Sequence, residues 1–100
     1  MHHVIVRYKV KPERVAENER LVRAVYDELA QVKPDGFRYA TYRLDDGVAF
    51  VHFSRSEHER VPLPELNAFQ RFQEDIRDRC DEPPVVTHAE TIGSYNGGPL

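Results

Sequence analysis

The spacing of apolar residues changes along the chain in an order that few folds can accommodate. Alternation at every second residue is typical of a strand, whereas steps of three and four are typical of an amphipathic helix. In chain order the segments are strand 2–10, helix 12–32, strand 37–44, strand 48–55, helix 64–80 and strand 85–95. Pro34-Asp35-Gly36 and Asp45-Asp46-Gly47 are turn sequences, and Pro83-Pro84 ends the second helical pattern. The predicted order is βαββαβ.

This order predicts a ferredoxin-like α+β fold. Two right-handed crossovers place both helices on one face of a four-stranded antiparallel sheet, with the predicted strand order 4-1-3-2. A chain of 100 residues has room for one core. We therefore expect one domain over residues 1–95, followed by a flexible tail over 96–100, where Gly and Pro leave little to bury.

Composition excludes several classes of function. Lys and Arg total 14 against 17 Asp and Glu, giving a formal net charge of -3, so no basic surface favours nucleic acid. No apolar run approaches the roughly 20 residues that cross a bilayer, and the first residues lack the apolar stretch of a signal peptide. We expect a cytoplasmic protein with no membrane or nucleic-acid partner. The single cysteine, Cys80, excludes an internal disulfide.

The two strands of the predicted hairpin carry large apolar side chains on both faces. Phe37, Tyr39 and Phe50 share one face. If the hairpin loop has two residues, the other face carries Tyr42, Leu44, Val51 and Phe53; a three-residue loop would change these partners. A single sheet with one face in water would expose several hundred Å² of apolar surface, more than monomers usually tolerate. The sequence therefore predicts a homodimer in which the two sheets face each other.

With this architecture the chain resembles the dimeric α+β barrel superfamily, in particular its antibiotic biosynthesis monooxygenase-like family. The likeness covers residues 4–95 and rests on four short segments, which are Val10-Lys11-Pro12, Gly36-Phe37-Arg38-Tyr39, Asp45-Asp46-Gly47 and Phe50-Val51-His52-Phe53. The first strand also resembles the stress-responsive branch of the superfamily. Such proteins include cofactor-free monooxygenases of aromatic polyketides, haem-degrading enzymes and isomerases. Haem-degrading relatives use an Asn, Trp and His set, and this chain has no Trp.

Two polar residues interrupt the apolar stripes of the predicted helices. Asn18 lies on the stripe of the first helix and Gln73 on that of the second. A buried polar group without a partner costs about 1–3 kcal/mol, so each must hydrogen-bond or face a polar cavity between helices and sheet. Asn18 has the further alternative of lying beyond the sheet edge in solvent. Both are candidate substrate-binding residues.

His52 is the candidate catalytic residue. It lies between Val51 and Phe53 on a predicted central strand, where burial would lower its pKa and keep the imidazole neutral. A neutral imidazole can take a proton from a phenol or hydroquinone, whose anion then reacts with dioxygen without metal or flavin. The alternative is a hydrogen-bonded histidine in the dimer core. The face that the side chain occupies decides between them.

The remaining candidates have weaker signals. Tyr26, Tyr42 and Arg38 can orient an aromatic substrate by hydrogen bonding, although tyrosine and arginine are also common at dimer interfaces and strand ends, which favours packing as the role of all three. His3, His52 and His88 fall on neighbouring strands, but the antiparallel layout separates His3 from His88, so we expect no metal site. The leading hypothesis is a cofactor-free monooxygenase for a small aromatic or quinol-type substrate. The alternative is a non-catalytic dimeric module that binds a small ligand or a partner.

Overall fold

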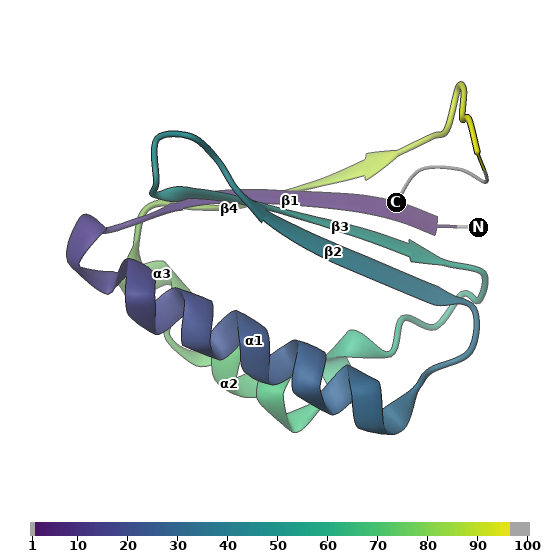
Figure 1. Ribbon diagram of the computed structural model, residues 1–100, viewed down its shortest axis with the longest axis horizontal. Helices are drawn as coiled ribbons and strands as arrows, with labels where there is room; N and C mark the ends of the chain where they lie inside the picture. Colours follow the sequence, from purple (N-terminus) through teal and green to yellow (C-terminus); the bar gives the residue numbers. More distant parts are fainter. Residues whose placement is uncertain (1, 97–100) are drawn as a thin grey trace.

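Four strands and a layer of helices make up the computed structural model, which describes residues 2–96 (Figure 1). The strands are β1 (His2–Val10), β2 (Phe37–Arg43), β3 (Ala49–Ser56) and β4 (Cys80–Ala89). The helices are α1 (Val15–Val32), α2 (Asn67–Glu74) and α3 (Ile76–Arg79), with the 3-10 turns η1 (Pro12–Arg14) and η2 (Leu63–Glu65). Apart from Asn96, the predicted tail over 96–100 lies outside the described residues.

The sheet has the predicted topology. Its order is β2-β3-β1-β4, the same as 4-1-3-2 read from the other edge, and all three pairings are antiparallel. Figure 1 shows the helices on one side of the sheet, while the chain after β4 rises away from them on the other side. The ferredoxin-like fold is therefore confirmed.

The segments that join α1 to the sheet follow from local chemistry. Lys33 ends α1 in the left-handed conformation and donates its backbone N–H to the Leu29 carbonyl. Gly36 has a φ of 67°, and a Cβ there would lie 2.9 Å from a Glu57 carboxylate oxygen. The flexible Glu57 side chain could move aside, but the positive φ would strain any residue with a side chain, so the turn into β2 favours glycine.

The prediction of one continuous second helix over 64–80 is wrong. Leu63–Glu65 is a 3-10 turn, α2 ends at Glu74, and Asp75 interrupts the helix with a φ of -129° and a ψ of 20°. The Asp75 carboxylate accepts a hydrogen bond from Arg14, which lies just before α1. No Gly or Pro marks this break, so local sequence does not reveal it.

The predicted bounds of the last strand are also wrong. The expected strand over 85–95 begins five residues earlier, at Cys80, and ends at Ala89. Pro83 and Pro84 lie inside it, together with register irregularities opposite Arg7 and Lys9. The prolines are tolerated because β4 is an edge strand and because its pairing with β1 is irregular at this point, so neither missing N–H interrupts a regular ladder.

Alternate residues of each strand separate two faces of the sheet with different surroundings. The helix face carries Tyr8, Tyr39, Phe50 and His52 toward α1 and α2. The opposite face, called here the open face, carries Ile5, Arg38, Tyr42, Val51, Phe53, Arg55 and Val85. The pairing of Tyr42 with Val51 agrees with the partners expected for a two-residue loop, so the aromatic residues divide between the faces as that alternative predicted. The core lies between the helix face and the helices.

Candidate functional site

His52 lies at the centre of the helix face with both ring nitrogens hydrogen-bonded. Its side chain is only 4% exposed. Nε2 is 2.7 Å from the hydroxyl of Tyr8, while Nδ1 is 2.7 Å from that of Tyr39 and 2.9 Å from that of Thr41. Burial lowers the pKa of His52 to about 4, so the imidazole is neutral at physiological pH. The side chain therefore belongs to the helix–sheet core of the single chain. The alternative of a hydrogen-bonded histidine in the dimer core is right about the hydrogen bonds and wrong about the location.

The hydroxyl groups around His52 continue into a connected series of buried hydrogen bonds, called here the buried polar chain. It consists of Arg79, Asn18, Tyr8, His52, Tyr39 and Thr41. Burial raises the pKa of Tyr8 and that of Tyr39, so both phenols keep their protons and can donate. Tyr26 joins the end of the chain through a 2.7 Å contact between its hydroxyl and Thr41 Oγ1.

Arg79 begins this chain and is fully buried at 0% exposure. Its Nε donates to Asn18 Oδ1 at 2.9 Å, its Nη2 donates to the Phe72 carbonyl at 2.8 Å, and its guanidinium lies 5.3 Å from the centre of the Phe72 ring. Nη1 has no hydrogen-bond partner among the described residues. A buried cation with one unbonded nitrogen is costly, and an apolar side chain would fill the same space at lower cost.

A cavity of about 370 Å³ lies between the helix face and α2. Apolar side chains form most of its wall, including Phe69, Phe72 and Val86. The polar residues in the wall are Tyr39, His52, Ser54, Gln73 and His88. Mostly apolar walls with a few polar groups are typical of small-molecule sites, and this volume is in their usual range.

The structure brings some of the sequence-predicted residues together at this cavity. His52 and Gln73 line it from β3 and α2. Gln73 is exposed, so the expectation that it is buried on the apolar stripe of the second helix is wrong. Glu28 of α1 fixes the start of α2, because its carboxylate accepts hydrogen bonds from the backbone N–H groups of Asn67 and Ala68. The position of Gln73 opposite the sheet therefore depends on α1.

Asn18 and Tyr26 lie behind the cavity wall. Asn18 is completely buried, so the alternative that placed it in solvent beyond the sheet edge is wrong. It contacts Tyr8 and Arg79, and neither it nor Tyr26 lines the cavity. Tyr26 instead borders a shallow hollow with Thr41 and Phe50. Both reach His52 only through other hydroxyl groups.

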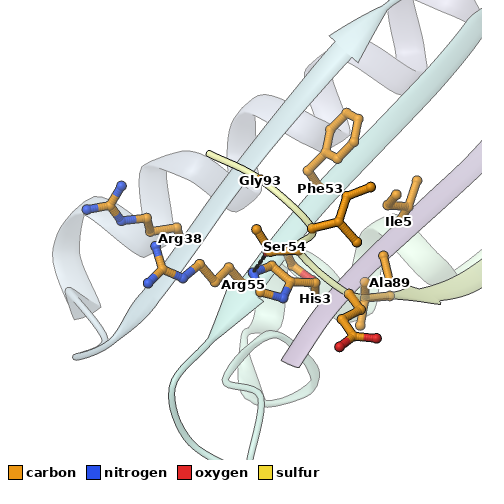
Figure 2. Close-up of a pocket in the computed structure, with 12 residues that line it drawn as sticks. His3, Ile5, Arg38, Phe53, Ser54, Arg55, Ala89 and Gly93 are labelled. Carbon is orange, nitrogen blue, oxygen red and sulfur yellow. Dashed lines mark hydrogen bonds between the residues drawn. The ribbon is translucent and has the colours of Figure 1, made fainter. Parts of the chain in front are cut away.

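Arg38 and Tyr42 lie on the open face, on the far side of the sheet from His52. Arg38 lines a pocket of about 290 Å³ with Arg55, Phe53 and the segment 89–93, and Figure 2 shows the Arg38 and Arg55 side chains beside each other. Thr91 holds this segment against β1 through a 3.2 Å contact between its Oγ1 and His3 Nε2. Tyr42 lines a separate open-face hollow. A single small substrate cannot contact these two residues and His52 together.

The histidines do not converge on a metal site. No group of three His, Cys, Asp or Glu side chains within residues 2–96 is arranged to hold a metal ion. The expectation that the antiparallel layout separates His3 from His88 is wrong, because His88 pairs with Val4 near the end of β4 and so lies at the same end of the sheet as His3. Alternation of side chains places them on opposite faces, with His88 beside His52 in the cavity and His3 in the open-face pocket.

Sequence reasoning missed four members of the buried polar chain. Tyr8 and Tyr39 fit the apolar alternation of their strands, and a tyrosine that packs its ring gives no sign of what its hydroxyl contacts. Thr41 is an ordinary strand residue. Arg79 has the sequence position of a favourable charge near the end of the second helical segment, but the helix breaks at Asp75 and β4 begins at Cys80, and Arg79 is buried between them. The one signal in the sequence for these buried partners is Asn18, because a buried amide requires hydrogen-bonding groups around it.

Comparison with known proteins gives a likeness in fold. No family model matches the chain, and no curated protein matches it. Among solved structures, Rv0793 from Mycobacterium tuberculosis is 21% identical, with 95% of this chain and 98% of that chain covered and a TM-score of 0.75. A structure named antibiotic biosynthesis monooxygenase is 20% identical, with 93% and 100% covered and a TM-score of 0.75. A conserved protein from Methanosarcina mazei Go1 is 18% identical, with 89% and 90% covered and a TM-score of 0.71.

These likenesses confirm the expected resemblance at the level of fold. The chain shares its fold with Rv0793 over 95% of its length and with the structure named antibiotic biosynthesis monooxygenase over 93%. Fold does not determine chemistry, so activity must be argued from the cavity itself. None of the helices within residues 2–96 is long and apolar enough to span a membrane.

Proposed function

We propose that this protein is a monooxygenase-like enzyme that oxidises a small aromatic or quinol-type substrate without a cofactor. One observation carries the proposal. The cavity between α2 and the sheet combines an apolar wall with a neutral imidazole and a tyrosine hydroxyl that are hydrogen-bonded to each other. The shared fold with a structure named antibiotic biosynthesis monooxygenase is consistent with it.

The cavity is suited to an aromatic ring that carries a hydroxyl group. Phe69 and Phe72 offer aromatic faces, and the ring of His52 lies 5.5 Å from that of Phe72. Gln73 supplies amide donors and Tyr39 a hydroxyl donor on opposite sides of the cavity. Donors that face a phenol oxygen stabilise its anion more than its neutral form, so they favour release of the phenolic proton to solvent.

The proposed reaction balances with dioxygen as the only co-reactant. The phenolate transfers electron density to dioxygen, and a C–O bond forms at the para carbon to give a hydroperoxide. The O–O bond then breaks with loss of water, leaving a quinone. For 1-naphthol the sum is naphthol plus dioxygen giving naphthoquinone plus water, and the substrate supplies all four electrons. No external reductant is required.

The role of His52 in this proposal differs from that of a base with a free nitrogen. Both ring nitrogens are already hydrogen-bonded to Tyr8, Tyr39 and Thr41. A substrate oxygen cannot reach either nitrogen without displacing a buried hydroxyl. We therefore propose that His52 acts through the Tyr39 hydroxyl, which lines the same cavity.

Oxygen consumption with 1-naphthol tests the proposed activity. The purified protein, treated with a chelator and assayed with a heat-denatured control, is expected to consume oxygen and form naphthoquinone in equal amounts. His52→Gln is expected to lower the rate at least about tenfold, because it removes the ring that orients the hydroxyl groups. His3→Gln, the same substitution on the open face, should leave the rate unchanged. Equal rates for native and denatured protein, or no loss in His52→Gln, would overturn the proposal.

The non-catalytic alternative has one observation in its favour. Both nitrogens of His52 are engaged within the protein, so the cavity can bind an aromatic ligand without reacting with it. Calorimetry with 1-naphthol under argon separates the two functions. Binding that depends on Gln73 but is followed by no oxygen uptake in air would favour a ligand-binding module.

We also propose that the working form is a homodimer with its open faces in contact. Val85 is 63% exposed and Tyr42 45% exposed, and Phe53 lies between them on the same face. Ile92, on the segment that follows β4, is 101% exposed. Such a set of exposed apolar side chains exceeds what a monomer usually presents. A second copy covers them and places the helices on the outside.

Sedimentation over a range of protein concentrations tests the dimer. The native chain is expected to sediment as a dimer at micromolar concentration. Val51→Glu places a charge at the centre of the open face and should shift the protein to monomer, while Gln70→Glu on α2 should not. A native chain that remains monomeric would contradict the proposal.

A further inference from the structure

The buried polar chain begins at the guanidinium of Arg79, which can only donate hydrogen bonds. A guanidinium has five N–H donors, no acceptor, and keeps its proton at any pH relevant to the protein. The oxygen of the Asn18 amide must therefore face Arg79, at 2.9 Å. This leaves the NH₂ group of Asn18 to donate to the hydroxyl of Tyr8 at 3.0 Å.

The same direction continues from Tyr8 to His52. Because the Tyr8 oxygen accepts from Asn18, its single hydrogen is available for His52 Nε2, 2.7 Å away. A neutral imidazole has one protonated and one unprotonated nitrogen. If Nε2 accepts from Tyr8, the proton is on Nδ1, where the oxygens of Tyr39 and Thr41 are both within 2.9 Å to accept it.

The opposite arrangement is disfavoured. With the proton on Nε2, the Tyr8 oxygen would accept from both His52 and Asn18, and the Tyr8 hydrogen would have no acceptor in the contacts it makes. A buried polar hydrogen without an acceptor is strongly unfavourable. Tyr8 is 2% exposed, so water offers no easy replacement.

We infer that Arg79 is a positioning residue that acts through Asn18 and Tyr8 to hold His52 as the tautomer protonated on Nδ1. His52 thereby donates toward Tyr39 and Thr41. The Tyr39 oxygen accepts from the imidazole, and its own hydrogen is left to point to the cavity. This consequence rests on the proposed function. The Tyr39 hydroxyl donates a hydrogen bond to a bound phenolate, and Nδ1 of His52 cannot accept a proton from the substrate because it already carries one.

Nitrogen NMR of the histidine side chains in the full chain tests the tautomer without any substrate. The protonated and unprotonated nitrogens of a neutral imidazole have clearly different chemical shifts, and the His52 signals are identified by their loss in His52→Gln. In the native protein, the tautomer of His52 with the proton on Nδ1 is expected to be about tenfold or more as populated as the tautomer with the proton on Nε2. A native protein with Nε2 protonated would overturn the inference, whatever the variants do.

Asn18→Asp reverses the direction of the chain with almost no change in shape. The carboxylate still accepts from Arg79, but it has no hydrogen for Tyr8, so Tyr8 must donate to it and accept from His52. The His52 proton is then expected to move to Nε2, reversing the tautomer ratio. Asn67→Asp, the same substitution at the exposed start of α2, should leave the ratio unchanged. A folded Asn18→Asp protein that keeps Nδ1 protonated would show that Arg79 and Asn18 do not set the tautomer.

The NMR result and the naphthol assay can fail independently. If the tautomer is as expected but naphthol is not oxidised, the proposed function fails and the positioning role of Arg79 stands. If naphthol is oxidised but the native His52 is protonated on Nε2, the function stands and the inference fails.

Discussion

The two faces of the sheet use neighbouring residues of the same strands in opposite ways. On the helix face, His52 and Tyr8 are buried and hydrogen-bonded to each other. On the open face, one residue away along the same strands, Val51 lies half-buried and Arg7 exposed. The helix face thus includes buried polar groups within a mainly apolar core, whereas the open face exposes apolar side chains such as Tyr42 and Val85 beside charged ones.

This difference between the faces indicates that their residues meet different requirements. A sheet that needed only stability would bury apolar residues and expose polar ones. A buried set of polar groups is kept only if each is satisfied, and it then fixes orientation as well as packing. We infer that the helix face is organised around the chemistry of His52, while the open face is organised for contact with a second copy.

The largest effect is expected from removing a large side chain on each face. Phe72→Ala should lower the free energy of unfolding by about 3–5 kcal/mol, because Phe72 is buried against Tyr8, His52 and Arg79. Phe53→Ala should cost about 1–2 kcal/mol within one subunit, because Phe53 is only partly buried there. Denaturant unfolding at two protein concentrations measures both.

If the proposed dimer forms, any further loss in Phe53→Ala should depend on protein concentration, because it would arise from the contact between the two copies. Equal, concentration-independent losses in the two variants would show that the faces do not differ in the way described.

The next effect is a dependence of stability on pH that comes from His52. Burial lowers its pKa from 6.5 to about 4 in the folded protein, so the unfolded chain binds the proton more tightly. The contribution of His52 to the free energy of unfolding is therefore fully present above the unfolded pKa. It decreases as pH falls toward 4, by about 3 kcal/mol in total. The difference in unfolding free energy between native protein and His52→Gln, measured from pH 7 to pH 4, isolates this contribution.

His3→Gln, on the open face, is the matched control and should keep the native pH dependence, because His52 is still present. If His52→Gln has the same slope as native protein, the imidazole is not held neutral by burial.

The smallest effect compares two tyrosines three residues apart on β2. Tyr39→Phe removes a hydroxyl 2.7 Å from His52 Nδ1 and should cost about 1 kcal/mol of unfolding free energy, since Thr41 still accepts from the ring. Tyr42→Phe alters an exposed side chain on the open face and should change stability by less than about 0.5 kcal/mol. A larger loss in Tyr42→Phe than in Tyr39→Phe would reverse the comparison.

Much of the fold could be predicted because its signals are local. The alternation in residues 2–10 and the stripe through Val22 and Val25 place β1 and α1 close to their observed positions. The errors occur where a distant contact overrides local preference. Asp75 interrupts the second helix beside Arg14, and the prolines of β4 are accepted because that strand lies at an edge and pairs irregularly with β1 there.

The candidate site was less predictable, because its members are far apart in sequence. Asn18 was recognised as a buried amide that needs partners, but those partners are Tyr8 and Arg79, ten residues before and 61 residues after it. Arg38 and Tyr42 were grouped with His52 by residue type. The register of β2 places them on the other face of the sheet.

The sequence by itself determined the order of strands and helices, the apolar stripes of the helices and of the first strand, and the presence of polar residues that required partners. These follow from periodicity, which is a property of neighbouring residues. Only the tertiary structure decided that His52 faces the helices and that Arg79 turns inward to Asn18, and with them which hydroxyl groups surround the imidazole. Hydrogen-bond partners depend on distances of a few ångströms between distant segments, and those distances exist only once the chain has folded.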